Sequence, residues 1–111
     1  MKVSQLASFI GGICIQSDFT DTDISAVYTG DLLSDILGNA DDGCIIVTIQ
    51  AHRNTVAVAA TKDSPAVIIC NDRPVPDDMI TAAKEEHIAL FTTSKNQFQI
   101  SGMLYDALGV K

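Results

Sequence analysis

The chain has 111 residues, 47% of them apolar, and 14 acidic against 7 basic side chains give it a formal net charge of −7. A chain of this length and composition can bury one core without disulfides or metals, so we expect a single domain over residues 1–111. The acidic balance argues against nucleic acid and anionic membranes as partners, because both are bound through basic surfaces.

The three cysteines, Cys14, Cys44 and Cys70, each lie in or beside an apolar run, and none has the spacing of a metal-ligand motif. Such a set is typical of free thiols in a reducing compartment, so we expect a cytoplasmic protein without a bound metal or cofactor. The apolar segment 6–15 is interrupted by Gly11-Gly12 and falls short of the ~20 residues that cross a bilayer. We interpret this segment as helix, turn and short strand.

The first half of the chain predicts, in order, a helix over 3–10, a strand over 13–16, a strand over 24–30 and a helix over 32–38. Asp31 is the expected N-cap of the helix over 32–38, and Gly38 suits the position after its last turn. The apolar face of that helix would consist of Leu32, Leu33, Ile36 and Leu37.

The second half predicts strands over 44–49, 66–70 and 88–92, a helix from Pro76 or Asp77 to His87, and a final helix ended by Gly109. The segment 54–61 contains valines that allow a strand, but its alanines and its place between two strands favour a buried helix. Ser94 and Gln97 form a capping-box pattern before the last helix. This alternation predicts an α/β fold with three αβα layers and a mostly parallel sheet.

Polar clusters follow four of the predicted strands, at 28–31, 48–54, 71–74 and 92–96. The carboxyl ends of parallel strands meet at one edge, where α/β proteins bind ligands. The candidate ligand-binding residues are Asp31, Gln50, His52, Arg53, Asn54, Asn71, Arg73, Thr92, Thr93 and Ser94.

Arg53 and Arg73 are the candidates for gripping a phosphate or carboxylate, because a guanidinium offers a planar fork of donors. The amides and hydroxyls suit a base or a sugar, and His52 can change charge near neutral pH. Each residue also has a structural alternative: Asn54 and Ser94 as helix caps, His52 as a turn residue, and the arginines as ion-pair partners of Asp72 or Asp31.

Three stretches together resemble a known family. They are Y-T-G-D-L-L-S-D-I-L-G-N-A at 28–40, T-I-Q-A-H-R-N-T-V-A-V-A at 48–59, and T-x-x-x-x-x-F-x-I-S-x-x-L-Y at 92–105. The chain resembles the DRTGG domain family over about 3–108, most closely its small standalone members encoded near iron-hydrogenase genes in anaerobic bacteria. The resemblance implies a fold like the N-terminal domain of HPr kinase/phosphorylase, a regulatory or assembly role, and frequent homodimers.

The chain departs from both short motifs that give this family its name. Arg53 matches the arginine of the first motif, but His52 stands in place of its aspartate, and Asn54-Thr55 follows. At the second, 70-CNDRP-74 replaces a Thr-Gly-Gly turn. The resemblance alone therefore does not carry the family's ligand over to this chain.

The sequence lacks the motifs of two enzyme classes, of which the resemblance suggests only the first, a kinase. There is no GxxxxGK[ST] loop for phosphoryl transfer and no GxSxG elbow for a nucleophilic triad. We therefore expect a non-catalytic regulatory or assembly module that takes a small anionic or nucleotide ligand at the strand ends. One alternative is a pure protein-interaction module of a redox or hydrogenase-related complex. A second is a small enzyme that uses His52, Arg53 and a Cys70 thiol of lowered pKa.

Overall fold

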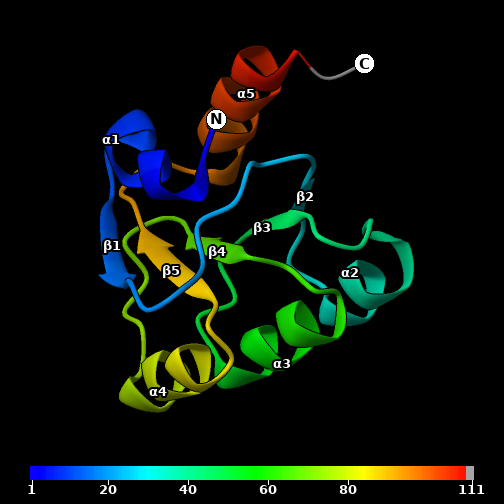
Figure 1. Ribbon diagram of the computed structural model, residues 1–111, viewed down its shortest axis with the longest axis vertical. Helices are drawn as coiled ribbons and strands as arrows, with labels where there is room; N and C mark the ends of the chain where they lie inside the picture. The colour runs from blue at the N-terminus through cyan, green and yellow to red at the C-terminus, as the bar shows by residue number, and fades with distance from the viewer. Residues whose placement is uncertain (110–111) are drawn as a thin grey trace.

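The computed structural model describes residues 1–109, and its elements follow one another as a repeated β-α pattern (Figure 1). The elements are η1 (Val3–Gln5), α1 (Leu6–Ile10), β1 (Ile13–Gln16), β2 (Val27–Thr29), α2 (Leu33–Asn39), β3 (Ile45–Thr48), α3 (Arg53–Thr61), β4 (Ala66–Ile69), α4 (Asp77–Glu85), β5 (Ala89–Thr92) and α5 (Gln97–Leu108). All the predicted strands and helices are confirmed, including the helical interpretation of 54–61.

The strands form one sheet in the order β1-β5-β4-β3-β2. β2, β3, β4 and β5 pair in parallel, whereas β1 lies antiparallel to β5 at one edge. The predicted, mostly parallel sheet is therefore confirmed. Every residue of β3 and β4 is buried, as expected for central parallel strands covered on both faces.

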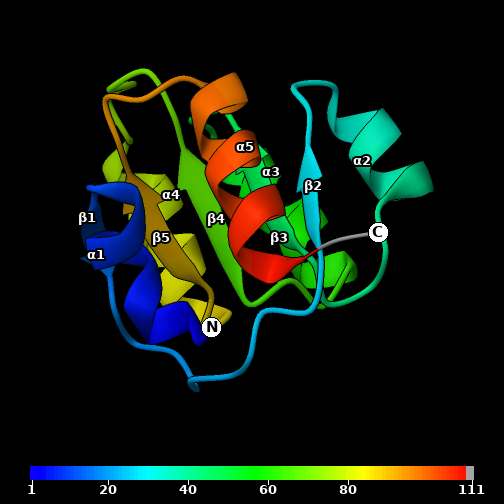
Figure 2. The same cartoon turned by 90° about the horizontal axis from the view of Figure 1, so that it is seen from above.

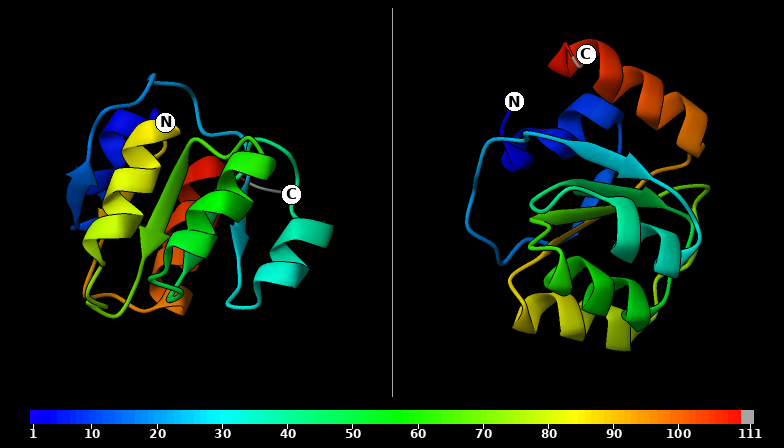
Figure 3. Two further views of the ribbon diagram at one scale, coloured as in Figure 1. Left: turned by 90° about the horizontal axis from the view of Figure 1, so that it is seen from below. Right: turned by 90° about the vertical axis from the view of Figure 1, so that its right-hand side faces the viewer.

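Two hydrophobic cores, one on each face of the sheet, make the three layers (Figure 3). Ile45 and Ile68 point to the face that α1 and α5 cover, where they meet Ile10, Ile100 and other buried side chains. The intervening residues of the same strands point to the opposite face, which α2, α3 and α4 cover. The period-2 alternation of strand side chains thus fills both cores from the same two apolar runs.

The helix after β2 differs from its prediction at both ends. α2 begins at Leu33 with Leu32 as a cap that has no side-chain bond, and Gly38 lies inside the helix rather than after it. Ile36 is fully buried, but Leu32 is 66% and Leu37 44% exposed, so the expected apolar face is only partly covered. The predicted N-cap, Asp31, fails because its carboxylate is bound by β3 and α5 instead, as described below.

Two further helix ends were also misplaced. α5 begins after Asn96, which forms the capping box with Gln99, so the pattern of Ser94 and Gln97 is a coincidence of spacing. α4 ends at Glu85, two residues before His87, because His87 takes a left-handed φ of 57° that no helix continues through. Gly109 does end α5, with a φ of 59°.

Candidate functional site at the strand ends

The loops that follow β2, β3, β4 and β5 lie along one edge of the sheet, because these four strands run in parallel. In Figure 2 this edge is at the top, where the chain leaves β2 towards α2 and leaves β5 towards α5. The four polar clusters predicted from the sequence therefore do share an edge. Their side chains fall into a β2–β3 group and a β4–β5 group.

Asp31 is the centre of the β2–β3 group. Its carboxylate accepts hydrogen bonds from the Thr48 hydroxyl (3.2 Å), the Ile49 backbone N–H (3.2 Å) and the Gln97 side-chain amide (3.0 Å). Gln50 donates to the Asp31 carbonyl at 2.8 Å. Asp31 therefore joins the ends of β2 and β3 to the start of α5.

His52 is the N-cap of α3. Its Nδ1 accepts a hydrogen bond from the backbone N–H of Asn54 at 3.0 Å. The suggested cap, Asn54, is thus the residue being capped. His52, Arg53 and Asn54 are all exposed, and Arg53 is the first residue of the helix.

The β4–β5 group is built mainly from backbone. Asn71 and Asp72 have left-handed φ angles of 63° and 50°, and their N–H groups donate to the carbonyls of Lys95 (3.0 Å) and Thr93 (2.9 Å). Asn and Asp tolerate this conformation better than other non-glycine residues do. The turn that lacks the family's glycines therefore still adopts a glycine-like conformation, and it positions the exposed side chain of Arg73.

The segment after β5 contributes one cation that we did not predict as a site residue. The Lys95 ammonium donates to the Ile10 carbonyl at the end of α1, at 2.9 Å. Thr93 is buried and its hydroxyl accepts from the Lys95 N–H at 3.2 Å, so this threonine shapes the turn. Thr92 is half-buried and Ser94 is exposed.

Neither arginine is neutralised within the described residues 1–109. The ion pairs there are Lys2–Asp23 at 3.6 Å and Lys62–Asp42 at 3.4 Å, and the Nδ1 of His87 lies 3.6 Å from the Asp18 carboxylate. The expected alternatives, pairing of Arg53 or Arg73 with Asp72 or Asp31, are not observed. Two exposed guanidinium groups therefore stand at the ends of the neighbouring strands β3 and β4.

Cys70 does not have the lowered pKa that an enzyme based on it would need. Its side chain is fully buried in the core on the α1 and α5 face. Burial, and then the negative charge of Asp31, raise the pKa of this thiol to about 11. At neutral pH the sulfur is a thiol, which is a poor nucleophile.

The described residues hold no group of three or more His, Cys, Asp or Glu side chains close enough to bind a metal ion. None of their helices is both long enough and apolar enough to cross a bilayer. A groove of about 430 Å³ lies between β2 and α5; its lining includes Thr29 at the end of β2 but none of the predicted site residues. The sequence analysis missed this groove because its lining comes from small side chains far apart in the chain.

Comparison with known proteins supports the fold at two levels. Residues 44–108 match the family described as HPr Serine kinase N terminus. A curated relative, the HPr kinase/phosphorylase of Streptococcus uberis (strain ATCC BAA-854 / 0140J), is 44% identical over 43 residues, which are 39% of this chain and 14% of the relative. The chain therefore corresponds to only a small part of that enzyme.

A solved structure covers more of the chain. It contains the CBS and DRTGG domains of the regulatory region of the Clostridium perfringens pyrophosphatase, complexed with its activator diadenosine tetraphosphate. The TM-score is 0.73, over 92% of this chain and 45% of that one, with 13% sequence identity. This likeness establishes the fold.

Proposed function

Because the chain belongs to the family of HPr serine kinase N-terminal domains, we propose that it is a non-catalytic regulatory or assembly module that binds a small anionic ligand. The binding surface would be the edge at the carboxyl ends of the strands. The proposal is carried by two arginines: Arg53 at the start of α3 and Arg73 in the loop after β4. Both are exposed and lie outside the ion pairs of residues 1–109. The chain has a net charge of −7, so two guanidinium groups without an ion-pair partner in the described part of the chain make this edge more positive than the chain as a whole.

The chemistry of this edge favours a phosphorylated ligand. A guanidinium donates two parallel hydrogen bonds to a phosphate or carboxylate. The first turn of α3 contains no acidic residue, so its positive helix end adds to the field of Arg53. The side chains of Asn71 and Ser94 are exposed on the neighbouring loops and are available to a sugar or a base. A nucleotide therefore fits better than a simple anion, and the activator of the pyrophosphatase of similar fold is a reasonable first probe.

The module would act without catalysis, in the cytoplasm. The thiol of Cys70 is buried and protonated, and the Nδ1 of His52 is used as a helix cap. The enzyme alternative rests on His52, Arg53 and Cys70, and the contacts of His52 and Cys70 support structural roles for these two residues. Cys14, Cys44 and Cys70 are free, which suits a reducing compartment.

An interaction module is the second candidate, and exposed apolar side chains favour it. Leu32 is 66%, Phe98 86% and Ile13 67% exposed. Such residues are common at subunit contacts, and we propose that the protein forms a homodimer through some of them. Sedimentation equilibrium at micromolar concentration tests this: a dimer has about twice the chain mass, whereas a mass near 11.8 kDa would refute it.

The ligand proposal is tested by a thermal-shift scan with ATP, diadenosine tetraphosphate, acetyl phosphate and inorganic phosphate. A ligand present at a hundred times its dissociation constant adds about 2.7 kcal/mol to the free energy of unfolding. For a domain of this size that raises the Tm by roughly 10 °C.

The matched variants are Arg53→Ala with Arg73→Ala, and Lys84→Ala as a control that removes one exposed charge near the end of α4. We expect the shift to persist in the Lys84 variant and to disappear in the double-arginine variant while its Tm without ligand stays unchanged. If no compound shifts the wild-type Tm, the ligand proposal fails and the interaction module takes its place.

A further inference from the structure

A separate feature of the molecule is the free edge of the sheet at β2. The backbone N–H and C=O groups of Tyr28 point towards β3. This follows from the flanking ladder bonds, which run from the Ile45 N–H to the Ala26 carbonyl and from the Gly30 N–H to the Val47 carbonyl. Hydrogen bonds of a parallel strand alternate between its two sides, so the N–H and C=O groups of Val27 and Thr29 point outwards. Within residues 1–109 no strand lies beyond β2. The edge is therefore a template for one more strand.

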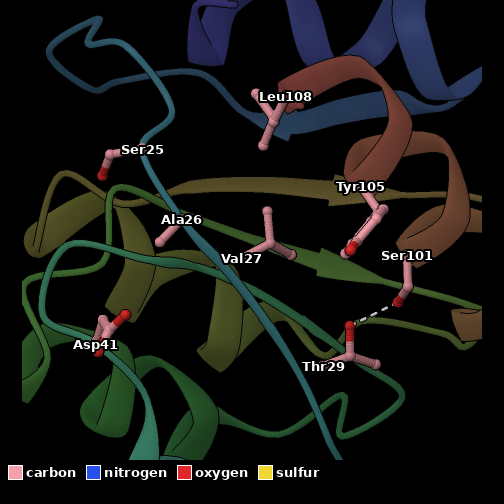
Figure 4. Close-up of a pocket in the computed structure, with 8 residues that line it drawn as sticks. All are labelled: Ser25, Ala26, Val27, Thr29, Asp41, Ser101, Tyr105 and Leu108. Carbon is pink, nitrogen blue, oxygen red and sulfur yellow. Dashed lines mark hydrogen bonds between the residues drawn. The ribbon is translucent and has the colours of Figure 1, made fainter. Parts of the chain in front are cut away.

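The groove of about 430 Å³ lies beside this edge, on the face that α5 covers. Figure 4 shows Val27 and Thr29 of β2 together with Ser101, Tyr105 and Leu108 of α5, and Thr29 and Ser101 share a hydrogen bond of 2.6 Å. Side chains of an added strand would alternate between the two faces of the sheet, as those of Val27 and Tyr28 do, so every second side chain would enter the groove. An exposed edge and a pocket for alternate side chains are the two features of peptide binding by strand addition.

The charge of the groove indicates what kind of strand fits. Among residues 1–109, its lining contains no Lys, Arg or His, and the one charged residue there is Asp41. The neighbouring Asp42 pairs with Lys62, whereas no ion pair of Asp41 exists among residues 1–109. Tyr105, 61% exposed, offers a ring face to a cation. A basic side chain is therefore favoured, and a second copy of this acidic chain is not.

We propose that the β2 edge and its groove bind an extended basic segment of a partner protein, which adds a strand beside β2. Lys or Arg side chains of that segment would enter the groove, with their aliphatic stems over Val27 and Leu108 and their charges near Asp41 and Tyr105. The apolar side chains between them would point to the opposite face of the sheet. This site is independent of the strand-end ligand site, because the two share no residue.

The probe is the acetylated hexapeptide Lys-Val-Lys-Val-Lys-Val, titrated into ¹⁵N-labelled full-length protein and followed by two-dimensional NMR. Two control peptides are Glu-Val-Glu-Val-Glu-Val and a version of the basic peptide N-methylated at alternate residues, which keeps the charge but loses the donors. We expect the amides of Val27, Thr29 and Ser101 to shift with the basic peptide alone. The amides of Arg53 and Arg73 should not move.

Two charge-reversal variants make the test specific. Asp41→Lys should weaken binding of the basic peptide at least tenfold and give measurable binding of the acidic one. Asp106→Lys makes the same charge change at an exposed residue beside Tyr105 that does not line the groove and has no ion pair among residues 1–109, and it should alter affinity less than threefold. Both positions are exposed, so both variants are expected to fold.

Three results would overturn the proposal. The first is an absence of shifts at millimolar peptide. The second is equal binding of the N-methylated peptide or equal effects of the two variants, which would mean attraction by net charge alone. The third is a concentration-dependent shift of the Val27 and Thr29 amides without peptide, which would assign the edge to a second copy of this chain.

Discussion

Replacing Asp31 with Ala should destabilise the protein, because this carboxylate links the loop after β2 to the end of β3 and the start of α5. The substitution removes the acceptor of the Thr48 hydroxyl, the Ile49 N–H and the Gln97 amide. Thr48 is fully buried and Ile49 half-buried, so their donors cannot simply turn to water. At about 1 kcal/mol for each of these two donors, and with nothing counted for the half-buried Gln97 amide, which can turn to water, the free energy of unfolding falls by about 2 kcal/mol.

For a domain of this size, 2 kcal/mol corresponds to a fall in Tm of about 8 °C, measurable by calorimetry or by urea unfolding. The Tm of the Asp31→Asn variant should lie between those of the wild type and the alanine variant, because an amide oxygen still accepts some of the hydrogen bonds. Asp106→Ala is the control, since Asp106 is exposed and its side chain has no hydrogen bond or ion pair among residues 1–109. The Tm of this variant should differ from that of the wild type by less than about 2 °C. An equal effect of the Asp31 and Asp106 substitutions would refute the reasoning.

Three other predictions follow from single contacts. Asn96→Ala should lower the free energy of unfolding in urea by about 1 kcal/mol because it removes the α5 capping box, whereas Ser94→Ala should lower it by less than about 0.5 kcal/mol. The reverse order would mean that Ser94 is the N-cap, as expected from the sequence. The Cys70 thiol, with its pKa raised to about 11, should react with Ellman's reagent only when the protein unfolds, and rapid labelling of the native protein would contradict its burial. The hydroxyl and N–H of Ser4 lower the pKa of Asp21 in the folded protein. This carboxylate therefore contributes stability above its ordinary pKa of roughly 3.9, and the contribution is lost as the pH falls through the lower folded-state pKa. Asp21→Asn should reduce the loss of stability in acid, and an unchanged dependence of the free energy of unfolding on pH would contradict the contact.

The sequence predicts the sheet well because the strands have a strong local signal. The runs 44–49 and 66–70 are apolar and β-branched over their whole length, a pattern that none of the helices within residues 1–109 has. The alternation of these runs with helical segments was enough to place four loops on one edge. Residues 54–61 were harder, since their valines suit a strand, and only their place between two strands indicated the crossover helix that α3 forms.

The helix caps were predicted poorly because a capping side chain has competing partners that local spacing does not reveal. Asp31 precedes α2, but the donors of β3 and α5 bind its carboxylate from 17 to 66 residues away. Ser94 has the right spacing to Gln97, yet the turn after β5 occupies 93–95 and delays the helix start to Asn96. The β2–α5 groove escaped prediction for the same reason, since Thr29 and Ser101 meet across 72 residues.

The most direct test of the ligand site is an NMR titration of the ¹⁵N-labelled protein with diadenosine tetraphosphate and with ATP. The account predicts saturable shifts of the amides of Arg53, Asn71 and Arg73, and their loss in the double Arg53→Ala, Arg73→Ala variant. Saturable shifts confined to other surfaces, or none at millimolar nucleotide, would contradict a nucleotide site at the ends of the strands.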